Sequence, residues 1–277
     1  MAGCRSGQNA MAERSAALRE VDRIDTGPRF MAEDAARLNE RFADCTTLEL
    51  LRAVLIDGVA GKVALVSSFG AESAVLLHLA AQVSRHVPVL FLETGKHFPE
   101  TLAYRDTLVE RLGLADLRNL TPDADVLAAR DGNGLRWSFD PDGCCEIRKV
   151  APLAGALAQF DASLTGRKSF QSATRANLPR FELDTSDAQG RLKINPLIDW
   201  SADDIQQWLD ANHLPRHPLV ALGYPSIGCS PCTSKVAPGE DPRSGRWKGW
   251  DKIECGIHGV AATENPEDLP PGYEPAF

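Results

Sequence analysis

Short apolar runs alternate with amphipathic stretches after residue 60, and this alternation predicts the fold. Apolar runs typical of strands buried on both faces cover residues 62–67 and 87–92, and further short strands are expected over residues 117–120 and 162–165. The stretches expected to form helices between them cover residues 74–83, 98–112 and 145–160. Strand–helix alternation places parallel strands side by side with helices over them. We therefore predict an α/β fold, a parallel twisted sheet with helices on both faces, whose ligands bind at the carboxyl ends of the strands.

The two ends of the chain do not follow this pattern. Residues 1–29 are small, polar and charged, which is typical of a flexible lead-in, and residues 31–57 carry apolar residues at the spacing of one or two helices. A later helix is expected to begin at Ser201, an N-cap residue followed by acidic residues. The chain then becomes rich in Gly, Pro and Cys. We expect a lead-in at 1–29, a single α/β domain at 30–240 and a mobile C-terminal segment at 241–277.

Composition, charge and the lengths of the apolar runs indicate where the protein acts and which partners it lacks. With 277 residues and 43% apolar content, the chain can bury a full core. The net charge of −8 argues against a general nucleic-acid binder. No apolar run approaches the roughly 20 residues that span a bilayer, and the N-terminus lacks the apolar stretch of a signal peptide. We therefore expect a cytoplasmic protein with no membrane or nucleic-acid partner. The sequence is compatible with a homo-oligomer and does not fix the number of copies.

Two close pairs of cysteines suit a metal centre. Cys144 and Cys145 are adjacent, and Cys229 and Cys232 form a Cys-x-x-Cys motif. Adjacent side chains diverge, so two neighbouring thiolates fit poorly on one tetrahedral zinc, whose ligands are usually separated by two to four residues. An iron–sulfur cubane has four irons, and neighbouring cysteines can each bind a different one. The pattern favours a [4Fe–4S] cluster, with a structural zinc site or unrelated buried thiols as the alternatives.

A fifth cysteine, Cys255, suits a nucleophile. It lies in the motif Glu-Cys-Gly-Ile-His, three residues before His258. The thiolate is the nucleophilic form of cysteine, and the glycines of this segment leave it free to swing over a site and away again. Cys-x-x-His could also supply two of the four ligands of a zinc site. However, no complementary pair remains once the other four cysteines are assigned to a cluster.

A polar loop and a set of basic residues predict an anion pocket. The turn 67–73 joins a strand to a helix, where free backbone N–H groups and the helix dipole favour anions, although such turns also serve as plain caps. It is not a Walker A loop, because no Lys-Ser or Lys-Thr follows its glycine. The basic residues near the cysteine motifs are Arg148, Lys149, Lys235, Arg243, Arg246 and Lys248. One arginine guanidinium can donate two hydrogen bonds to the oxygens of a phosphate or sulfate. We therefore expect a positive pocket that binds an anion in this acidic protein. Arg175, after another strand, extends it.

These motifs together resemble those of the assimilatory adenylyl-sulfate (APS) reductases of the APS/PAPS reductase family. The resemblance covers nearly everything after residue 60. The matching motifs, in order, are SSFGAESAVLLH (67–78), CCEIRKVAPL (144–153), NPLIDW (195–200), GYPSIGCSPCT (223–233), GEDPRSGRW (239–247) and ECGIH (254–258).

The resemblance implies a fold of the adenine nucleotide α-hydrolase class and a set of site residues. It implies a [4Fe–4S] cluster on Cys144, Cys145, Cys229 and Cys232, with Cys255 as the nucleophile. The implied substrate-binding residues are Ser67, Ser68, Phe69, Gly70, Glu93, Thr94, Gly95, Lys149, Arg175, Arg243, Arg246 and His258. The chain departs from the family at Glu93: relatives commonly have aspartate there, so this carboxylate stands one methylene farther from the backbone.

The resemblance also implies the reaction. APS would be reduced to sulfite and AMP by reduced thioredoxin or a glutaredoxin-like donor, through an S-sulfocysteine intermediate. One alternative is the same reaction on 3′-phosphoadenylyl sulfate (PAPS), although enzymes devoted to PAPS typically lack the two cysteine pairs. Another is a tRNA-thiolating enzyme with a similar loop, which the acidic charge and the ECGIH motif disfavour. A non-enzymatic alternative is a zinc-bearing interaction module.

Overall fold

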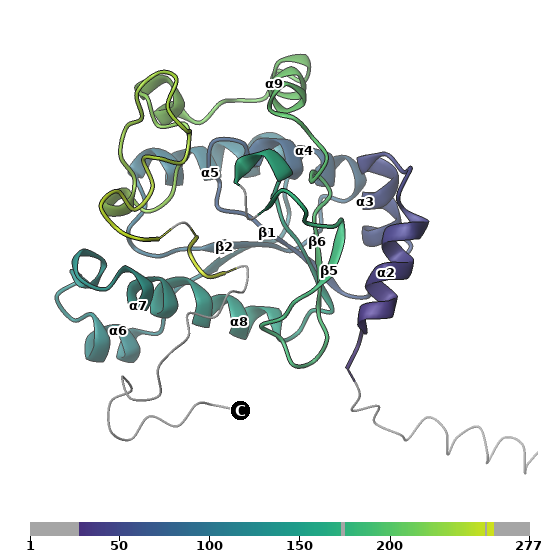
Figure 1. The fold of residues 1–277 in the computed structure, drawn as a ribbon, viewed down its shortest axis with the longest axis horizontal. Helices are drawn as coiled ribbons and strands as arrows, with labels where there is room; N and C mark the ends of the chain where they lie inside the picture. Colours follow the sequence, from purple (N-terminus) through teal and green to yellow (C-terminus); the bar gives the residue numbers. More distant parts are fainter. Residues whose placement is uncertain (1–27, 173–174, 253, 258–277) are drawn as a thin grey trace, which may run out of the picture.

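A six-stranded sheet with helices on both faces organises the chain (Figure 1). The computed structural model describes residues 28–172, 175–252 and 254–257. The strands are β1 Val63–Val66, β2 Val89–Leu92, β3 Leu117–Leu120, β4 Ala162–Leu164, β5 Phe181–Leu183 and β6 Leu192–Ile194. Their order is β3-β2-β1-β4-β6-β5, and every neighbouring pair is parallel except β5 with β6. The predicted α/β fold is therefore confirmed, with an antiparallel edge strand that the sequence analysis did not anticipate.

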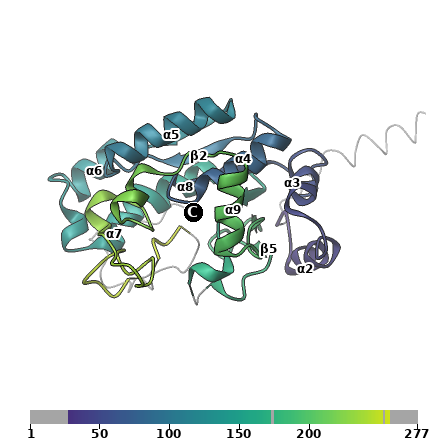
Figure 2. The ribbon, with the colours of Figure 1, turned by 90° about the horizontal axis from the view of Figure 1, so that it is seen from above.

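The helices bury the two faces of the sheet in separate cores. They are α2 Ala32–Arg41, α3 Thr47–Leu55, α4 Ser73–Val83, α5 Pro99–Leu112, α6 Ala124–Arg130, α7 Pro141–Cys145, α8 Ala151–Leu157 and α9 Ala202–Ala211. Side chains alternate across a strand, so Val89 and Phe91 pack with α4 and α5 in the larger core, whereas Leu90 and Leu92 pack with α8 in the smaller one. Figure 2 shows α9 and α4 from above, on the same side of the sheet. Within the described ranges no helix combines the length and apolar character needed to cross a membrane.

Local sequence signals explain where α9 begins and why the helix expected over 145–160 is interrupted. The Ser201 hydroxyl accepts a hydrogen bond from the Asp204 N–H at 3.1 Å, and the Asp204 carboxylate accepts one from the Ser201 N–H at 2.8 Å, which is a capping box. The helix expected over 145–160 is interrupted by a π-turn, Glu146–Val150, between α7 and α8. Pro152, two residues later, cannot donate a helical hydrogen bond. Such π-turns occur frequently at functional sites, and this one directly follows the first cysteine pair.

A buried histidine connects α5 to the segment that leads to the second cysteine pair. His217 is 1% exposed, its Nε2 lies 3.0 Å from the Thr101 hydroxyl, and its Nδ1 accepts a hydrogen bond from the Leu219 N–H at 3.2 Å. Its ring packs on Tyr104 at a centroid distance of 4.8 Å. Burial lowers the pKa of His217 to about 4. The neutral ring is therefore part of the folded state.

We expect acid to weaken the fold through His217. The folded-state pKa lies below the unfolded one, so the unfolded chain binds the proton first, and stability is lost as pH falls from about 6.5 to about 4. The loss should be about 3 kcal/mol, measured as the free energy of urea unfolding at each pH. His217→Gln should remove this part of the pH dependence, whereas His86→Gln, at an exposed position, should keep it. An equal pH dependence in all three proteins would contradict the assignment.

Candidate active site

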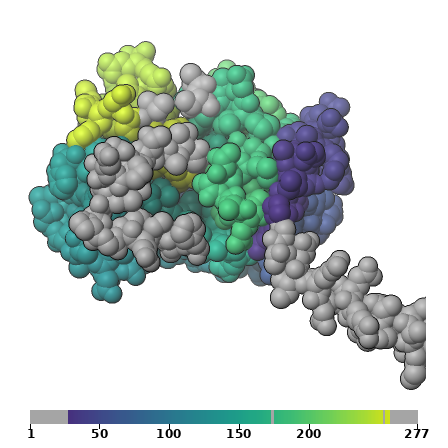
Figure 3. Space-filling view, turned by 60° about the horizontal axis from the view of Figure 1, so that its bottom comes forward, coloured from purple at the N-terminus to yellow at the C-terminus, as the bar shows by residue number. Residues whose placement is uncertain are grey.

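A cavity of about 520 Å³ opens at the carboxyl ends of the strands, where the sequence analysis placed the ligand. Segments far apart in the chain form its wall. The predicted site residues that line it are Ser67, Ser68, Gly70, Thr94, Lys149, Arg175, Cys229, Arg243, Arg246 and Cys255. In the space-filling view the yellow C-terminal residues lie beside the teal region of α6 to α8 (Figure 3). The ion pair between Lys252 and Asp142 joins these two regions. His258 lies outside the described residues.

The loop after β1 presents its backbone to the cavity. Phe69 has a positive φ of 48° and is fully buried, with its ring edge-on to Phe91 at 5.4 Å. Its side chain therefore points into the core and does not line the cavity. A side chain on Gly70 would meet the Ile227 carbonyl at 3.3 Å, so glycine allows the segment before Cys229 to approach. The loop and the start of α4 form a surface suited to a phosphate.

The three residues after β2 point in different directions. The Thr94 hydroxyl lies 3.4 Å from the Cys229 sulfur and faces the cavity. Glu93 and Gly95 do not line the cavity. The Glu93 carboxylate lies 3.6 Å from Arg105 of α5 and accepts a hydrogen bond from the Gly95 N–H at 3.1 Å. In this structure Glu93 is thus engaged with α5 and with its own turn, and its expected contact with the nucleotide stays a prediction.

The two cysteine pairs meet beside the cavity. Cys144 and Cys145 end α7, whereas Cys229 is the N-cap of the short helix Ser230–Cys232 and Cys232 is its last residue. The pKa of Cys144 is raised, mainly by burial but also by the thiolates of Cys229 and Cys232. Burial raises the pKa of Cys145 to about 11. All four thiols are free of disulfides. The fold thus brings together two pairs of cysteines that are more than 80 residues apart in the chain.

Lys149 lines the cavity and interacts with the charges of the paired cysteines and of Cys255. Burial would lower its pKa, but the thiolates of Cys229, Cys255 and Cys145 raise it. In return, Lys149 and the Thr94 hydroxyl lower the pKa of Cys229 against the effect of burial. The ammonium group is therefore held charged where thiolates and the cavity meet, and it can stabilise an anion there.

Arg246 closes the other side of the thiol cluster. Its guanidinium lies over the Trp247 ring at 4.5 Å, and the buried Arg246 Nε has no hydrogen-bond partner among the residues that the structure describes. Any side chain on Gly228 would collide with this guanidinium. Burial lowers the pKa of Arg246, while the Cys255 thiolate opposes that effect. A buried cation with an unused donor beside a cavity suits an anionic ligand.

The donor set of the paired cysteines fits an iron–sulfur cluster. In the described part of the chain, no three His, Cys, Asp or Glu side chains lie close enough together to share a single metal ion. A cubane does not require that arrangement, because each of its four cysteines binds a different iron. The four thiols are buried or half-buried, and Lys149 and Arg246 would offset the negative charge of such a cluster.

A buried ion pair fixes the turn that carries the first cysteine pair. Arg148 donates to the Asp131 carboxylate from Nη2 at 2.5 Å and from Nε at 3.1 Å, and from Nη1 to the Thr94 carbonyl at 2.7 Å. The two side chains are 8% and 0% exposed. Burial alone would raise the pKa of Asp131, but hydrogen bonds from Arg148 and the Arg136 N–H hold it below its ordinary value. The sequence analysis found Arg148 but gave no signal for Asp131.

We expect Asp131→Ala to destabilise the protein by about 3–5 kcal/mol, because it leaves the Arg148 charge buried without its partner. The free energy of unfolding in urea measures this loss. Asp44→Ala, at an exposed position with no hydrogen bond to its side chain in the described structure, is the matched control and should change stability by less than about 0.5 kcal/mol. Equal stability of the two variants would contradict the role given to the ion pair.

Further charged residues of the cavity wall come from segments whose partners the sequence did not reveal. Lys168 is 3% exposed and its ammonium lies 2.8 Å from the Glu72 carboxylate, beside the loop after β1. Glu254, the residue before Cys255, pairs with Arg175 at 2.8 Å and with Arg243 at 3.4 Å. No sequence pattern indicated these partners, since each pair joins segments at least 11 residues apart. The Glu254 carboxylate thus ties the residues around Cys255 to the cavity wall.

The fold and the cavity define an α/β protein of the adenine nucleotide α-hydrolase-like class, with thiols and cations at the carboxyl end of its sheet. Residues 62–235 match the family model described as the phosphoadenosine phosphosulfate reductase domain. The chain therefore belongs to the phosphoadenosine phosphosulfate reductase family, as the resemblance predicted.

Individual relatives agree with this assignment. The adenosine 5'-phosphosulfate reductase of Mesorhizobium japonicum is 47% identical over 240 residues, 87% of this chain and 93% of that protein. A protein of the same name from Chelativorans sp. is 54% identical over 209 residues, 74% of this chain and 83% of its own length. The crystal structure of phosphoadenylyl-sulfate (PAPS) reductase from Candida auris, a phosphate complex, superposes with a TM-score of 0.64 at 25% identity, covering 76% of this chain and all of that one.

Proposed function

We propose that this protein reduces adenosine 5'-phosphosulfate to sulfite and AMP. The single observation that carries the proposal is that Cys255 lines the same cavity as Lys149, Arg243 and Arg246. A nucleophilic thiol surrounded by cations suits attack on an anionic sulfur compound. The names of the relatives at 47% and 54% identity support APS as the substrate.

We further propose residues 30–240 as one domain and 241–277 as the segment that carries the nucleophile.

The first step transfers the sulfonate group to the protein. The loop at Ser67–Gly70, with Thr94 nearby, holds the nucleotide, while Lys149, Arg243 and Arg246 hold the phosphosulfate. The Cys255 thiolate attacks the sulfur and forms an S–S bond as the S–O bond to phosphate breaks. AMP leaves with the electron pair of that bond, and the cations stabilise the charge that develops on its phosphate. His258, as implied by the family, is a further proposed contact.

The second step requires a thiol donor of the thioredoxin or glutaredoxin type. A donor thiolate attacks the Cys255 sulfur, and sulfite leaves with the electron pair of the S–S bond. The second donor thiol then attacks the mixed disulfide and restores the Cys255 thiol, so the donor leaves oxidised. The two electrons that convert sulfate-level sulfur to sulfite come from the donor, consistent with the proposed cytoplasmic setting where thiols are kept reduced.

Cys144, Cys145, Cys229 and Cys232 would hold a [4Fe–4S] cluster. When bound, it supplies a compact centre of charge that orders the wall of the cavity beside Lys149. The residues carry out every bond-making step given above. Iron and acid-labile sulfide in the purified protein support this assignment. Zinc without iron would instead indicate a structural zinc site, and the electrostatic role proposed for the cluster would be withdrawn.

Intact mass tests the proposed intermediate. Incubation with APS alone, without a thiol donor, should add one SO3 group to the protein, and reduced thioredoxin should remove it with release of sulfite. PAPS under the same conditions should react more slowly, because the chain contains both cysteine pairs. Equal or faster reaction with PAPS would move the assignment to PAPS reduction, and no mass change with either nucleotide would contradict the proposed function.

A further inference from the structure

Glu254 anchors the segment of Cys255 through a side-on pair with Arg175. The Arg175 Nε and Nη2 both donate to one Glu254 oxygen, at 3.0 and 2.8 Å, and Nη2 also donates to the other, at 2.9 Å. Arg243 lies 3.4 Å from the second oxygen. Two-point contacts of this kind fix the orientation of a carboxylate as well as its position.

The pair is tied to the nucleotide loop by a chain of hydrogen bonds. Arg175 Nη1 donates to the Gln171 side-chain carbonyl at 2.6 Å, and Gln171 Nε2 donates to the Glu72 carboxylate at 2.9 Å. Arg175 is only 9% exposed in its side chain, so its guanidinium has little freedom to turn elsewhere. The residue next to the nucleophile is thus connected through part-buried hydrogen bonds to the loop expected to hold the nucleotide.

We propose that Glu254 and Arg175 form a positioning pair that sets Cys255 in line with the sulfur of the bound substrate, and that Arg175 acts through Glu254. This inference rests on the proposed function. Its reason is geometric: the two-point contact fixes the Glu254 carboxylate and, with it, the backbone that carries Cys255. Lys149, Arg243 and Arg246 hold the phosphosulfate.

A double-mutant cycle separates positioning from substrate binding. Glu254→Gln and Arg175→Gln should each slow the single-turnover sulfonation of Cys255 by about 10- to 100-fold, and the double variant should be no slower than either one. The Kd for APS should stay within about twofold in all three. If the two losses in sulfonation rate multiply in the double variant, the proposal is overturned. Weaker APS binding caused by Arg175→Gln alone would also overturn it and would make Arg175 a direct substrate contact.

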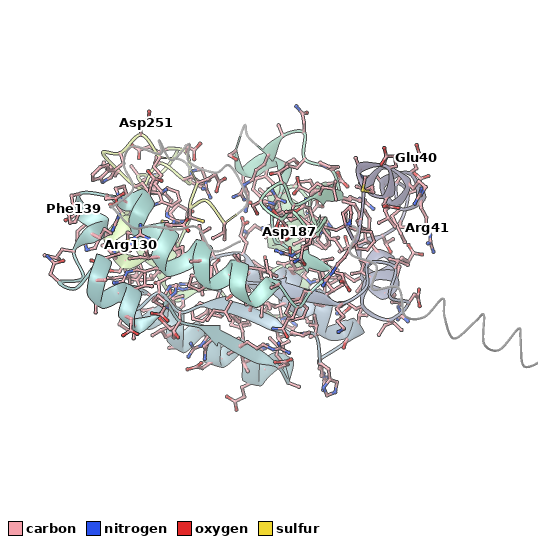
Figure 4. The ribbon with its side chains drawn as sticks, turned by 90° about the horizontal axis from the view of Figure 1, so that it is seen from below. Glu40, Arg41, Arg130, Phe139, Asp187 and Asp251 are labelled. Atoms are coloured by element: carbon pink, nitrogen blue, oxygen red, sulfur yellow. The ribbon has the colours of Figure 1, made fainter. Side chains whose placement is uncertain are left out.

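A second readout does not depend on APS chemistry. Uncharged iodoacetamide, used without nucleotide and followed by peptide mass analysis, reports how accessible Cys255 is. Glu254→Gln and Arg175→Gln should both speed its alkylation, by about tenfold. The matched control is Asp251→Asn, which removes the same charge three residues earlier at an exposed position on the outer edge of the segment (Figure 4), and it should leave the rate unchanged.

The two readouts can fail separately. If APS fails to sulfonate the unaltered protein, the proposed function is wrong, while faster alkylation in the two variants still supports the pair. If sulfonation occurs normally and neither variant changes the alkylation of Cys255, the anchoring pair is wrong and the proposed function stands.

Discussion

Replacing Cys255 by serine is expected to lower APS reduction by a factor on the order of 10³ or more, because a serine hydroxyl cannot take the place of the attacking thiolate. The cations that bind the phosphosulfate remain, so the affinity for APS should change little. Sulfite release under steady-state conditions measures the first quantity, and equilibrium binding of APS measures the second. Intact mass should show no added SO3 group in this variant.

Cys45→Ser provides the matched control for that experiment. Cys45 lies in the turn between α2 and α3, is half-buried and does not line the cavity. The same atomic change there should leave sulfite release intact. Continued formation of the sulfonated protein in Cys255→Ser would show that another residue carries the intermediate, and the proposed mechanism would have to be abandoned.

Lys149→Ala is expected to produce the second-largest loss, about 10²- to 10³-fold in the rate of sulfonation. The ammonium group lies where the cavity meets Cys229, Cys255 and Cys145, which together raise its pKa. Its removal takes away a charge that stabilises the departing phosphate. Because Lys149 is not a ligand of the proposed cluster, the content of iron and acid-labile sulfide should stay nearly unchanged.

The comparison with Lys248→Ala sharpens this prediction. Lys248 belongs to the same basic set in the sequence, but its side chain is exposed and does not line the cavity. That variant should sulfonate at close to the normal rate. If Lys149→Ala loses its iron together with its activity, Lys149 supports the cluster structurally, and a purely electrostatic role on the substrate is contradicted.

Much of the architecture could be predicted because its causes are local. The run 87–92 is apolar enough to identify a buried strand, and the capping box at Ser201 marks the start of α9. The edge strand β5 and its neighbour β6 were not predicted. Each has only three residues, too few for a period of two to be distinguished, and their pairing joins residues separated by a turn.

The sequence by itself determined which chemical groups the site contains: two cysteine pairs, a separate reactive thiol, a phosphate-type loop and a surplus of cations nearby. The tertiary structure alone decided how these groups face one another. It turned Phe69 into the core and Glu93 toward α5, placed Lys149 among the thiols, and paired Glu254 with Arg175. The physical reason is that residue type and local hydrogen bonding are properties of neighbours in the chain. Ion pairs across 79 residues depend instead on strand order and on the paths of the loops above the sheet.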